Sequence, residues 1–115
     1  MPRDYKIFLE DILEAAERII SYTGNPAVAD FTKDPRTLDA VIRNLLVIGE
    51  AVKSVPASVR EKHPSVEWRK WAGFRDVLIH EYFGIKPNVI RSVVEEKISA
   101  LHDQVKNILA EGRGK

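Results

Sequence analysis

Five polar side chains fall within positions 75–82 of the sequence, close enough together to form a catalytic site. They are Arg75, Asp76, His80, Glu81 and Tyr82. An imidazole can take up or release a proton near neutral pH, and a guanidinium can hold two phosphate oxygens at once. His80 and Arg75 could therefore cleave an RNA phosphodiester by way of its own 2′-hydroxyl, with His80 as base or acid and Arg75 stabilising charge on the phosphate. This chemistry needs neither a metal ion nor a cofactor.

Helical geometry determines how these groups could meet. Asp76 and His80 are four residues apart and would be neighbours on one face of a helix. Arg75 and His80 would lie about 140° apart around the helix axis, a gap that the arginine side chain covers only in part. A second copy of the motif would bring a second imidazole, so that one histidine could act as acid and the other as base. The spacing therefore favours a homodimer. Asp76 could orient the imidazole, or it could simply pair with Arg75.

Apolar residues recur at steps of three and four along most of the chain, which is typical of helices that bury one face. The pattern predicts helices over residues 5–22, 35–54, 56–63, 66–82 and 88–109. Asp34-Pro35 is a helix start signal, and Gly84 is placed to end the motif helix. Helix 35–54 is apolar on more than one side, so a second subunit could cover part of it. We expect an all-α, up-and-down bundle of four main helices and one short helix, in a single domain over residues 1–115.

Composition limits the possible classes of protein. Hydrophobic residues make up 44% of the 115 positions and charged residues 30%, as in ordinary folded proteins. No apolar run approaches the ~20 residues that span a bilayer, and the N-terminus does not resemble a secretory signal, so a cytoplasmic location is expected. The chain has no cysteine, and the three histidines His63, His80 and His102 share no metal-ligand spacing. The net charge of +1 argues against binding long nucleic acids by bulk electrostatics.

Two segments carry a resemblance to a known family. The pattern Arg75-x4-His80-x-Tyr82 resembles the R-x4-6-H-x-Y signature of HEPN-domain ribonucleases. The surrounding WAGFRDVLIHEYFGI, together with RNLLVIGEA at residues 43–51, resembles the HepT toxins of HepT/MntA toxin–antitoxin pairs. The resemblance extends over nearly the whole chain. It departs from the family at Asp76, where asparagine is frequent, and at Lys86, where an acidic residue is common.

The resemblance implies a HEPN-like helical bundle and a metal-independent endoribonuclease, the toxin of a type VII pair. Arg75 and His80 would be the catalytic residues, in a cleft shared by the two subunits of a homodimer. The partner would be a nucleotidyltransferase antitoxin that adenylylates Tyr82, so that the added phosphate blocks the cleft by its bulk and charge. The residues alone leave Tyr82 open to packing or to base stacking.

The resemblance also assigns a supporting role to two residues of helix 35–54. Asn44 and Glu50 would help to hold the catalytic side chains, although a solvated surface with weak ion pairs explains the same residues. Two other functions stay open. The chain could be a non-catalytic, substrate-binding subunit of a minimal nucleotidyltransferase, or a dimerising module whose polar motif lies in the interface.

Residues outside the motif have plainer interpretations. Trp68 and Trp71 are three apart and are expected to anchor the core or an interface. A basic cluster, Arg60, Lys62, Arg69 and Lys70, could meet RNA or an acidic antitoxin, with a solvated surface as the default.

Overall fold

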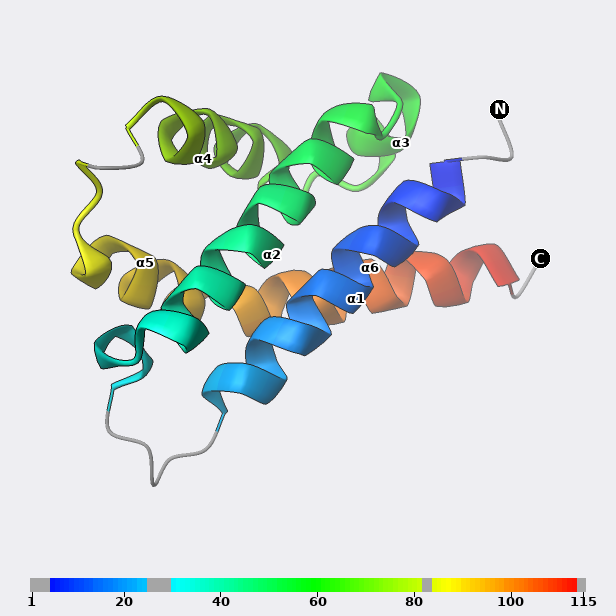
Figure 1. The fold of residues 1–115 in the computed structure, drawn as a ribbon. Coiled ribbons are helices and arrows are strands. Elements are labelled where there is room, and N and C mark those ends of the chain that lie inside the picture. The colour runs from blue at the N-terminus through cyan, green and yellow to red at the C-terminus, as the bar shows by residue number, and fades with distance from the viewer. Residues whose placement is uncertain (1–4, 25–29, 82–83, 114–115) are drawn as a thin grey trace.

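The computed structural model describes residues 5–24, 30–81 and 84–113, and these residues are helical with no strand among them (Figure 1). In chain order the elements are α1 (Tyr5–Thr23), the 3-10 turn η1 (Phe31–Lys33), α2 (Pro35–Ser54), α3 (Ala57–Lys62), α4 (Trp68–His80), α5 (Pro87–Val93), the π-helical segment η2 (Val94–Ile98) and α6 (Ser99–Arg113). In the described part of the chain, no helix has both the length and the apolar character needed to cross a membrane.

The long helices form a bundle in which successive members run in opposite directions. α1 and α2 make an antiparallel hairpin, α4 packs against α2, and α6 packs against α1 (Figure 1). α5, η2 and α6 follow one another without a break and act as one long helix. With α3 as the short member, the expected all-α bundle of four main helices is confirmed.

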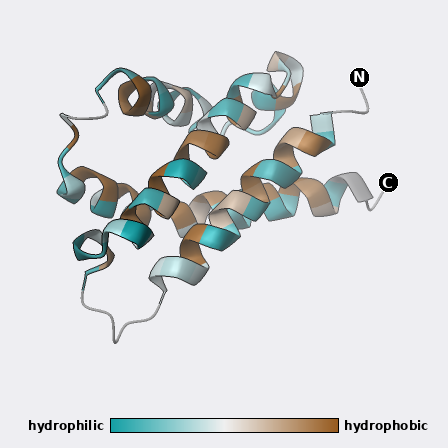
Figure 2. Cartoon of the chain, viewed as in Figure 1, coloured by the Kyte–Doolittle hydropathy of each residue, from teal (hydrophilic) through white to brown (hydrophobic). Residues whose placement is uncertain are grey.

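Aliphatic side chains from the long helices fill the space between them. Apolar and polar segments alternate along each helix, as expected when only one face is buried (Figure 2). The residues with the least exposure include Leu9, Ile12, Ile19, Val41, Leu45, Ile48, Leu78, Leu101 and Val105. Burying one such side chain contributes about 1.5–3 kcal/mol, so this shared core holds the helices together.

The start of α2 agrees with the sequence prediction because its signal is local. The Asp34 carboxylate accepts a hydrogen bond from the backbone N–H of Arg36 at 3.3 Å and another from the Thr37 hydroxyl at 2.7 Å. Pro35 takes the first helical position, where its missing N–H costs nothing. The helix spans Pro35–Ser54, as predicted.

The motif helix is shorter than the predicted 66–82. α4 begins at Trp68 and ends at His80, where the N–H of Glu81 still donates to the carbonyl of Val77 at 2.9 Å. Tyr82 lies outside the described residues. Gly84 follows the end of the helix, but no described glycine has a positive φ. Past the helix, the N–H of Gly84 donates to the carbonyl of Glu81 at 2.8 Å.

Two details of regular structure go beyond the sequence prediction. The loop before α2 contains the 3-10 turn η1, in which the Asp30 carboxylate accepts a hydrogen bond from the N–H of Thr32 at 2.9 Å. The last helix, predicted over 88–109, begins at Pro87, widens into the π-helical segment η2 and continues to Arg113.

Two glycines in the main helices have opposite surroundings. Gly49 of α2 faces α4. A methyl group added there would overlap Cβ of Arg75 and lie 2.7 Å from its Cγ. Gly73 of α4 is exposed, and a methyl group added there would meet nothing within 4 Å. Gly49 thus lets two backbones approach closely, whereas within one chain nothing requires a glycine at position 73.

We expect Gly49→Ala to destabilise the protein by about 1–3 kcal/mol, because the added methyl overpacks the α2–α4 contact. Gly73→Ala should instead stabilise the monomer by about 0.5–1 kcal/mol, because alanine is the better helix former and the space is open. Urea denaturation measures both, at one protein concentration low enough for the chain to be monomeric by size-exclusion chromatography. Equal stabilities for the two variants would contradict the close contact at Gly49.

His102 links α6 to α1 at the edge of the core. Its Nε2 lies 3.2 Å from the Glu17 carboxylate and its Nδ1 3.0 Å from that of Asp103, with the imidazole side chain only 17% exposed. The hydrogen bond with Asp103 and then that with Glu17 raise the pKa of His102 above its ordinary value. Protonation of this histidine therefore favours the folded state.

The contribution of His102 to stability should be fully present below its unfolded pKa of about 6.5 and lost as the pH rises through its higher folded-state pKa. The difference in unfolding free energy between the wild type and His102→Gln should shrink between pH 6 and pH 9. Urea titrations across that range test this. A difference that stays constant with pH would show that the ion pairs do not stabilise the fold.

Candidate active site

The motif arginine lies where α4 crosses α2. Gly49 leaves room for the backbone and first side-chain atoms of Arg75, and the guanidinium continues along α2 towards Glu50. The Arg75 side chain is 22% exposed, far less than the 63% of the Glu50 side chain. Packing at the helix crossing therefore fixes the stem of the arginine and leaves its terminal nitrogens near the surface.

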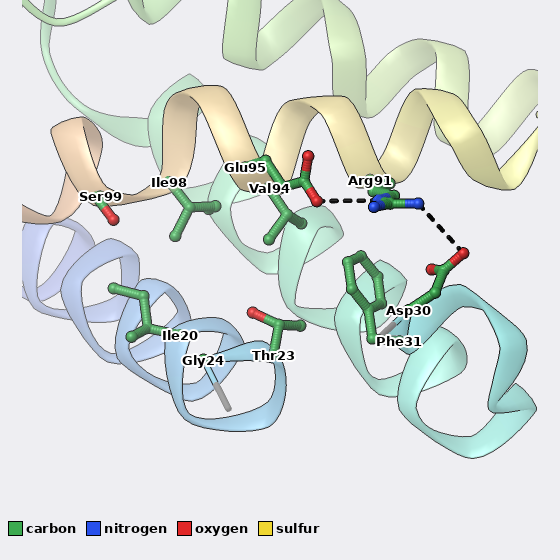
Figure 3. Close-up of a pocket in the computed structure, with 10 residues that line it drawn as sticks. All are labelled: Ile20, Thr23, Gly24, Asp30, Phe31, Arg91, Val94, Glu95, Ile98 and Ser99. Carbon is green, nitrogen blue, oxygen red and sulfur yellow. Dashed lines mark hydrogen bonds and ion pairs between the residues drawn. The ribbon is translucent and has the colours of Figure 1, made fainter. Parts of the chain in front are cut away.

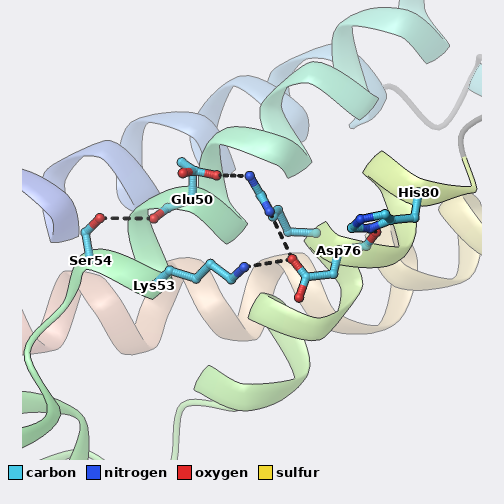
Figure 4. Close-up of polar contacts among 6 residues, drawn as sticks. Glu50, Lys53, Ser54, Asp76 and His80 are labelled. Carbon is cyan, nitrogen blue, oxygen red and sulfur yellow. Dashed lines mark hydrogen bonds and ion pairs between the residues drawn. The ribbon is translucent and has the colours of Figure 1, made fainter.

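Four charged side chains form one network around this crossing, referred to here as the Arg75 network (Figure 4). Arg75 Nη2 lies 2.7 Å from Glu50 Oε2, and Arg75 Nη1 lies 3.0 Å from Asp76 Oδ1. Lys53 Nζ reaches the same Asp76 Oδ1 at 2.7 Å. The two positive and two negative charges balance, so the network is neutral as it stands.

The network shifts the pKa values of its members. The hydrogen bond from Lys53, followed by that from Arg75, lowers the pKa of the Asp76 carboxyl below its ordinary value. The pKa of Arg75 is raised, first by its hydrogen bond with Asp76. The Asp76 carboxyl is therefore ionised at neutral pH. One hydrogen-bond donor of the network is unpaired: Arg75 Nε is buried and has no hydrogen-bond partner among the described residues.

His80 is exposed at the end of α4, and its ring is oriented by the backbone. Its Nδ1 lies 2.8 Å from the carbonyl oxygen of Asp76 (Figure 4). A carbonyl only accepts hydrogen bonds, so Nδ1 must carry the hydrogen. In the neutral ring, Nε2 then presents a lone pair to solvent and can act as a base. The protonated ring fits the same contact and can act as an acid.

The Asp76 carboxylate is directed to Arg75 and Lys53 rather than to the imidazole. Of the two roles that spacing left open, the contacts show the pairing with Arg75, while the peptide carbonyl of Asp76 meets His80. No hydrogen bond between Arg75 and His80 occurs within the described residues, as expected for positions about 140° apart on one helix. Asp76 is the residue that both of them contact.

Asn44 lies away from this network. Its side chain is buried with 5% exposure, and its amide donates to the carbonyl of Ala40 at 2.8 Å. It borders a surface hollow between α1 and α2, together with Arg18 and Tyr22. Asn44 and Gly49 are five positions apart and so point about 140° from one another, which is why one helix cannot bring both to α4.

Sequence reasoning missed Lys53. Its partner Asp76 is 23 positions away on another helix, and neither helical spacing nor a local motif reports such a contact. The proximity of Lys53 to Glu50 on one helical face was the only available signal, and it is a weak one.

The other candidates have structural roles or remain surface groups. Trp68 and Trp71 are buried, and Trp68 Nε1 donates to the carbonyl of His63 at 2.9 Å, so both serve the core. Arg60, Arg69 and Lys70 border one open hollow, which they share with two glutamates. Across residues 5–24, 30–81 and 84–113, no group of three metal-binding side chains is close enough to hold an ion.

A third hollow, of about 210 Å³, lies between the end of α1, η1 and the α5–η2 segment (Figure 3). Arg91 binds Asp30 at 3.4 Å and Glu95 at 2.9 Å across its wall. Hydrogen bonds from Thr32 lower the pKa of Asp30. The charged groups of this hollow satisfy one another and include no imidazole, so it offers no acid–base pair.

Comparison with known proteins gives one family. Residues 12–108 match the model of the HepT-like family, whose description is "Ribonuclease HepT-like". A protein of Caldanaerobacter subterraneus subsp. tengcongensis, named as a candidate RNase, is 45% identical over 108 residues, which are 94% of each chain. The "Probable ribonuclease HepT" of Thermococcus cleftensis is 45% identical over 101 residues, covering 88% of this chain and 92% of that one. No solved structure matched.

Proposed function

The chain belongs to the HepT-like ribonuclease family, and from that premise we propose that it is the toxin of a type VII, HepT/MntA-like toxin–antitoxin pair. It would act in the cytoplasm as a metal-independent endoribonuclease, built as a single helical domain over residues 1–115. One observation carries the proposal: Arg75, held by Glu50 and Asp76, and an exposed His80 with a free Nε2 meet around Asp76 at the surface.

The proposed reaction is transesterification within the RNA. His80 Nε2 removes the proton from a 2′-hydroxyl, and the 2′-oxygen forms a bond to the adjacent phosphorus. The bond from phosphorus to the 5′-oxygen breaks, and an acid returns a proton to that oxygen. The products are a 2′,3′-cyclic phosphate and a free 5′-hydroxyl. Arg75 binds the non-bridging oxygens, whose negative charge grows as the new bond forms.

The acid would come from a second subunit. One chain supplies a single suitable imidazole, so a homodimer that places two motifs in one cleft completes the acid–base pair. Two apolar residues of α4, Val77 and Ile79, are 41% and 46% exposed and offer surface for such a partner. Gly73 on α4 would allow a close approach of the partner's backbone.

Supporting residues hold the catalytic ones in place. Glu50 and Asp76 fix the guanidinium of Arg75, and the carbonyl of Asp76 fixes the imidazole of His80. Asn44 would act at a distance, by securing α2 through its bond to Ala40. A nucleotidyltransferase antitoxin would silence the enzyme by adenylylating Tyr82, because an AMP phosphate two residues from His80 competes with RNA for the same cations.

We expect the purified protein to cleave single-stranded RNA in the presence of EDTA, and His80→Ala and Arg75→Ala each to lower the rate at least 100-fold, the usual scale of acid–base and charge-stabilising groups. Products resolved by gel and mass spectrometry should carry the cyclic phosphate. His102→Ala is the matched control, since it removes an imidazole remote from the Arg75 network. Equal slow cleavage by the wild type and His80→Ala would favour the non-catalytic binding subunit.

Co-expression with the neighbouring nucleotidyltransferase gene should increase the intact mass of the protein by one or more AMP groups and abolish its RNA cleavage. Tyr82→Phe should keep its unmodified mass under the same conditions, because it lacks the acceptor hydroxyl. Tyr5→Phe controls for modification at another tyrosine. An AMP group found on the Tyr82→Phe protein would place the modification elsewhere.

A further inference from the structure

We infer that Lys53 is a second phosphate-binding cation of the active site and that it contacts RNA beside Arg75. This inference rests on the proposed ribonuclease function and adds a residue to the site.

Geometry brings the two cations to one point from different helices. Lys53 Nζ on α2 and Arg75 Nη1 on α4 contact the same oxygen, Oδ1 of Asp76, at 2.7 Å and 3.0 Å. The two nitrogens therefore cannot lie farther apart than these two distances combined. A phosphate group has two non-bridging oxygens that accept charged hydrogen bonds at about 2.7–2.9 Å, so a single phosphate can span the pair.

Both cations keep donors for a ligand. A lysine ammonium has three N–H donors, and Lys53 gives one to Asp76. Its side chain is 40% exposed, so the remaining donors face solvent. Each terminal nitrogen of Arg75 likewise carries two hydrogens and contacts one carboxylate. A phosphate could therefore bind without displacing Asp76.

Lys53 is needed to offset the net negative charge that the carboxylates leave around Arg75. Arg75 with its two carboxylate partners, Glu50 and Asp76, leaves one net negative charge, which would repel a phosphodiester. Lys53 brings the network to neutrality, which removes that repulsion. A surface ion pair that served only the fold would contribute little, so its removal would leave RNA binding unchanged.

The test is the binding of a fluorescent 2′-O-methyl RNA oligonucleotide, which lacks the hydroxyl needed for cleavage, measured by anisotropy over a range of salt concentrations. Lys53→Met should weaken binding about fivefold at low salt and reduce the slope of log K against log salt by about 0.7, the loss of one phosphate contact on a single strand. Lys53→Arg should retain most of the affinity. On cleavable RNA, KM should rise more than kcat falls.

Lys97→Met is the matched control, because Lys97 is 46% exposed and makes a similar ion pair, 3.0 Å long, with Glu67. It should bind RNA as the wild type does. The Lys53 inference is overturned if Lys53→Met behaves like Lys97→Met while the wild type binds and cleaves RNA. A wild type that neither binds nor cleaves RNA overturns the proposed function as well.

A second pair of variants separates direct contact from an effect through Asp76. In an Asp76→Asn background, Lys53→Met should still weaken RNA binding about fivefold, because it removes an ammonium that contacts the phosphate directly. No further loss in the double variant would show that Lys53 acts only by holding Asp76, and direct contact would be disproved. Circular dichroism of each variant confirms that the helices are retained.

Discussion

The close contact between α2 and α4 at Gly49 is the constraint on which the candidate active site depends. Because position 49 has no side chain, the first side-chain atoms of Arg75 can lie against the backbone of α2. That packing brings the guanidinium within reach of Glu50, and it brings Asp76 within reach of Lys53. A larger residue at position 49 would separate the helices, and both ion pairs between them would be lost together.

In the proposed reaction Arg75 binds a phosphate, and this role has two opposed requirements. The arginine has to be held in one orientation, and yet its charge must not be cancelled by the groups that hold it. Here two carboxylates hold the terminal nitrogens, and the ammonium of Lys53 offsets one of their charges. The cluster therefore stays close to neutral. Orientation and charge are thus controlled by different members of the network.

Local signals in the sequence predicted local structure well. The Asp34-Pro35 start placed α2 correctly, because a cap and a proline act on their own turn. The spacing of Asp76 and His80 correctly placed them side by side, but it could not show that the carbonyl, and not the carboxylate, meets the imidazole. No residue pattern in the sequence indicated the end of α4 at His80 or the π-helical segment η2.

Contacts between helices set the limit of what the sequence could predict for the site. Glu50 was expected to support Arg75, and it does contact Arg75. Asn44 was grouped with it on the strength of the family resemblance, but it points away from α4 and binds Ala40 instead. Lys53 was overlooked because its partner lies on another helix. Packing of the whole core determines which faces of α2 and α4 meet. Those faces in turn determine which side chains belong to the Arg75 network.

The widened turn η2 has a consequence for how this bundle can vary in length. A π turn closes its hydrogen bonds over five residues where an α turn uses four, so it holds one more residue in the same span. A single-codon deletion within Val94–Ile98 could be absorbed as an ordinary α turn, with α5 still against η1 and α6 still against α1. The same deletion in α2 would turn every later position by about 100° and expose its apolar stripe. A deletion of one residue should therefore be tolerated better in η2 than in α2.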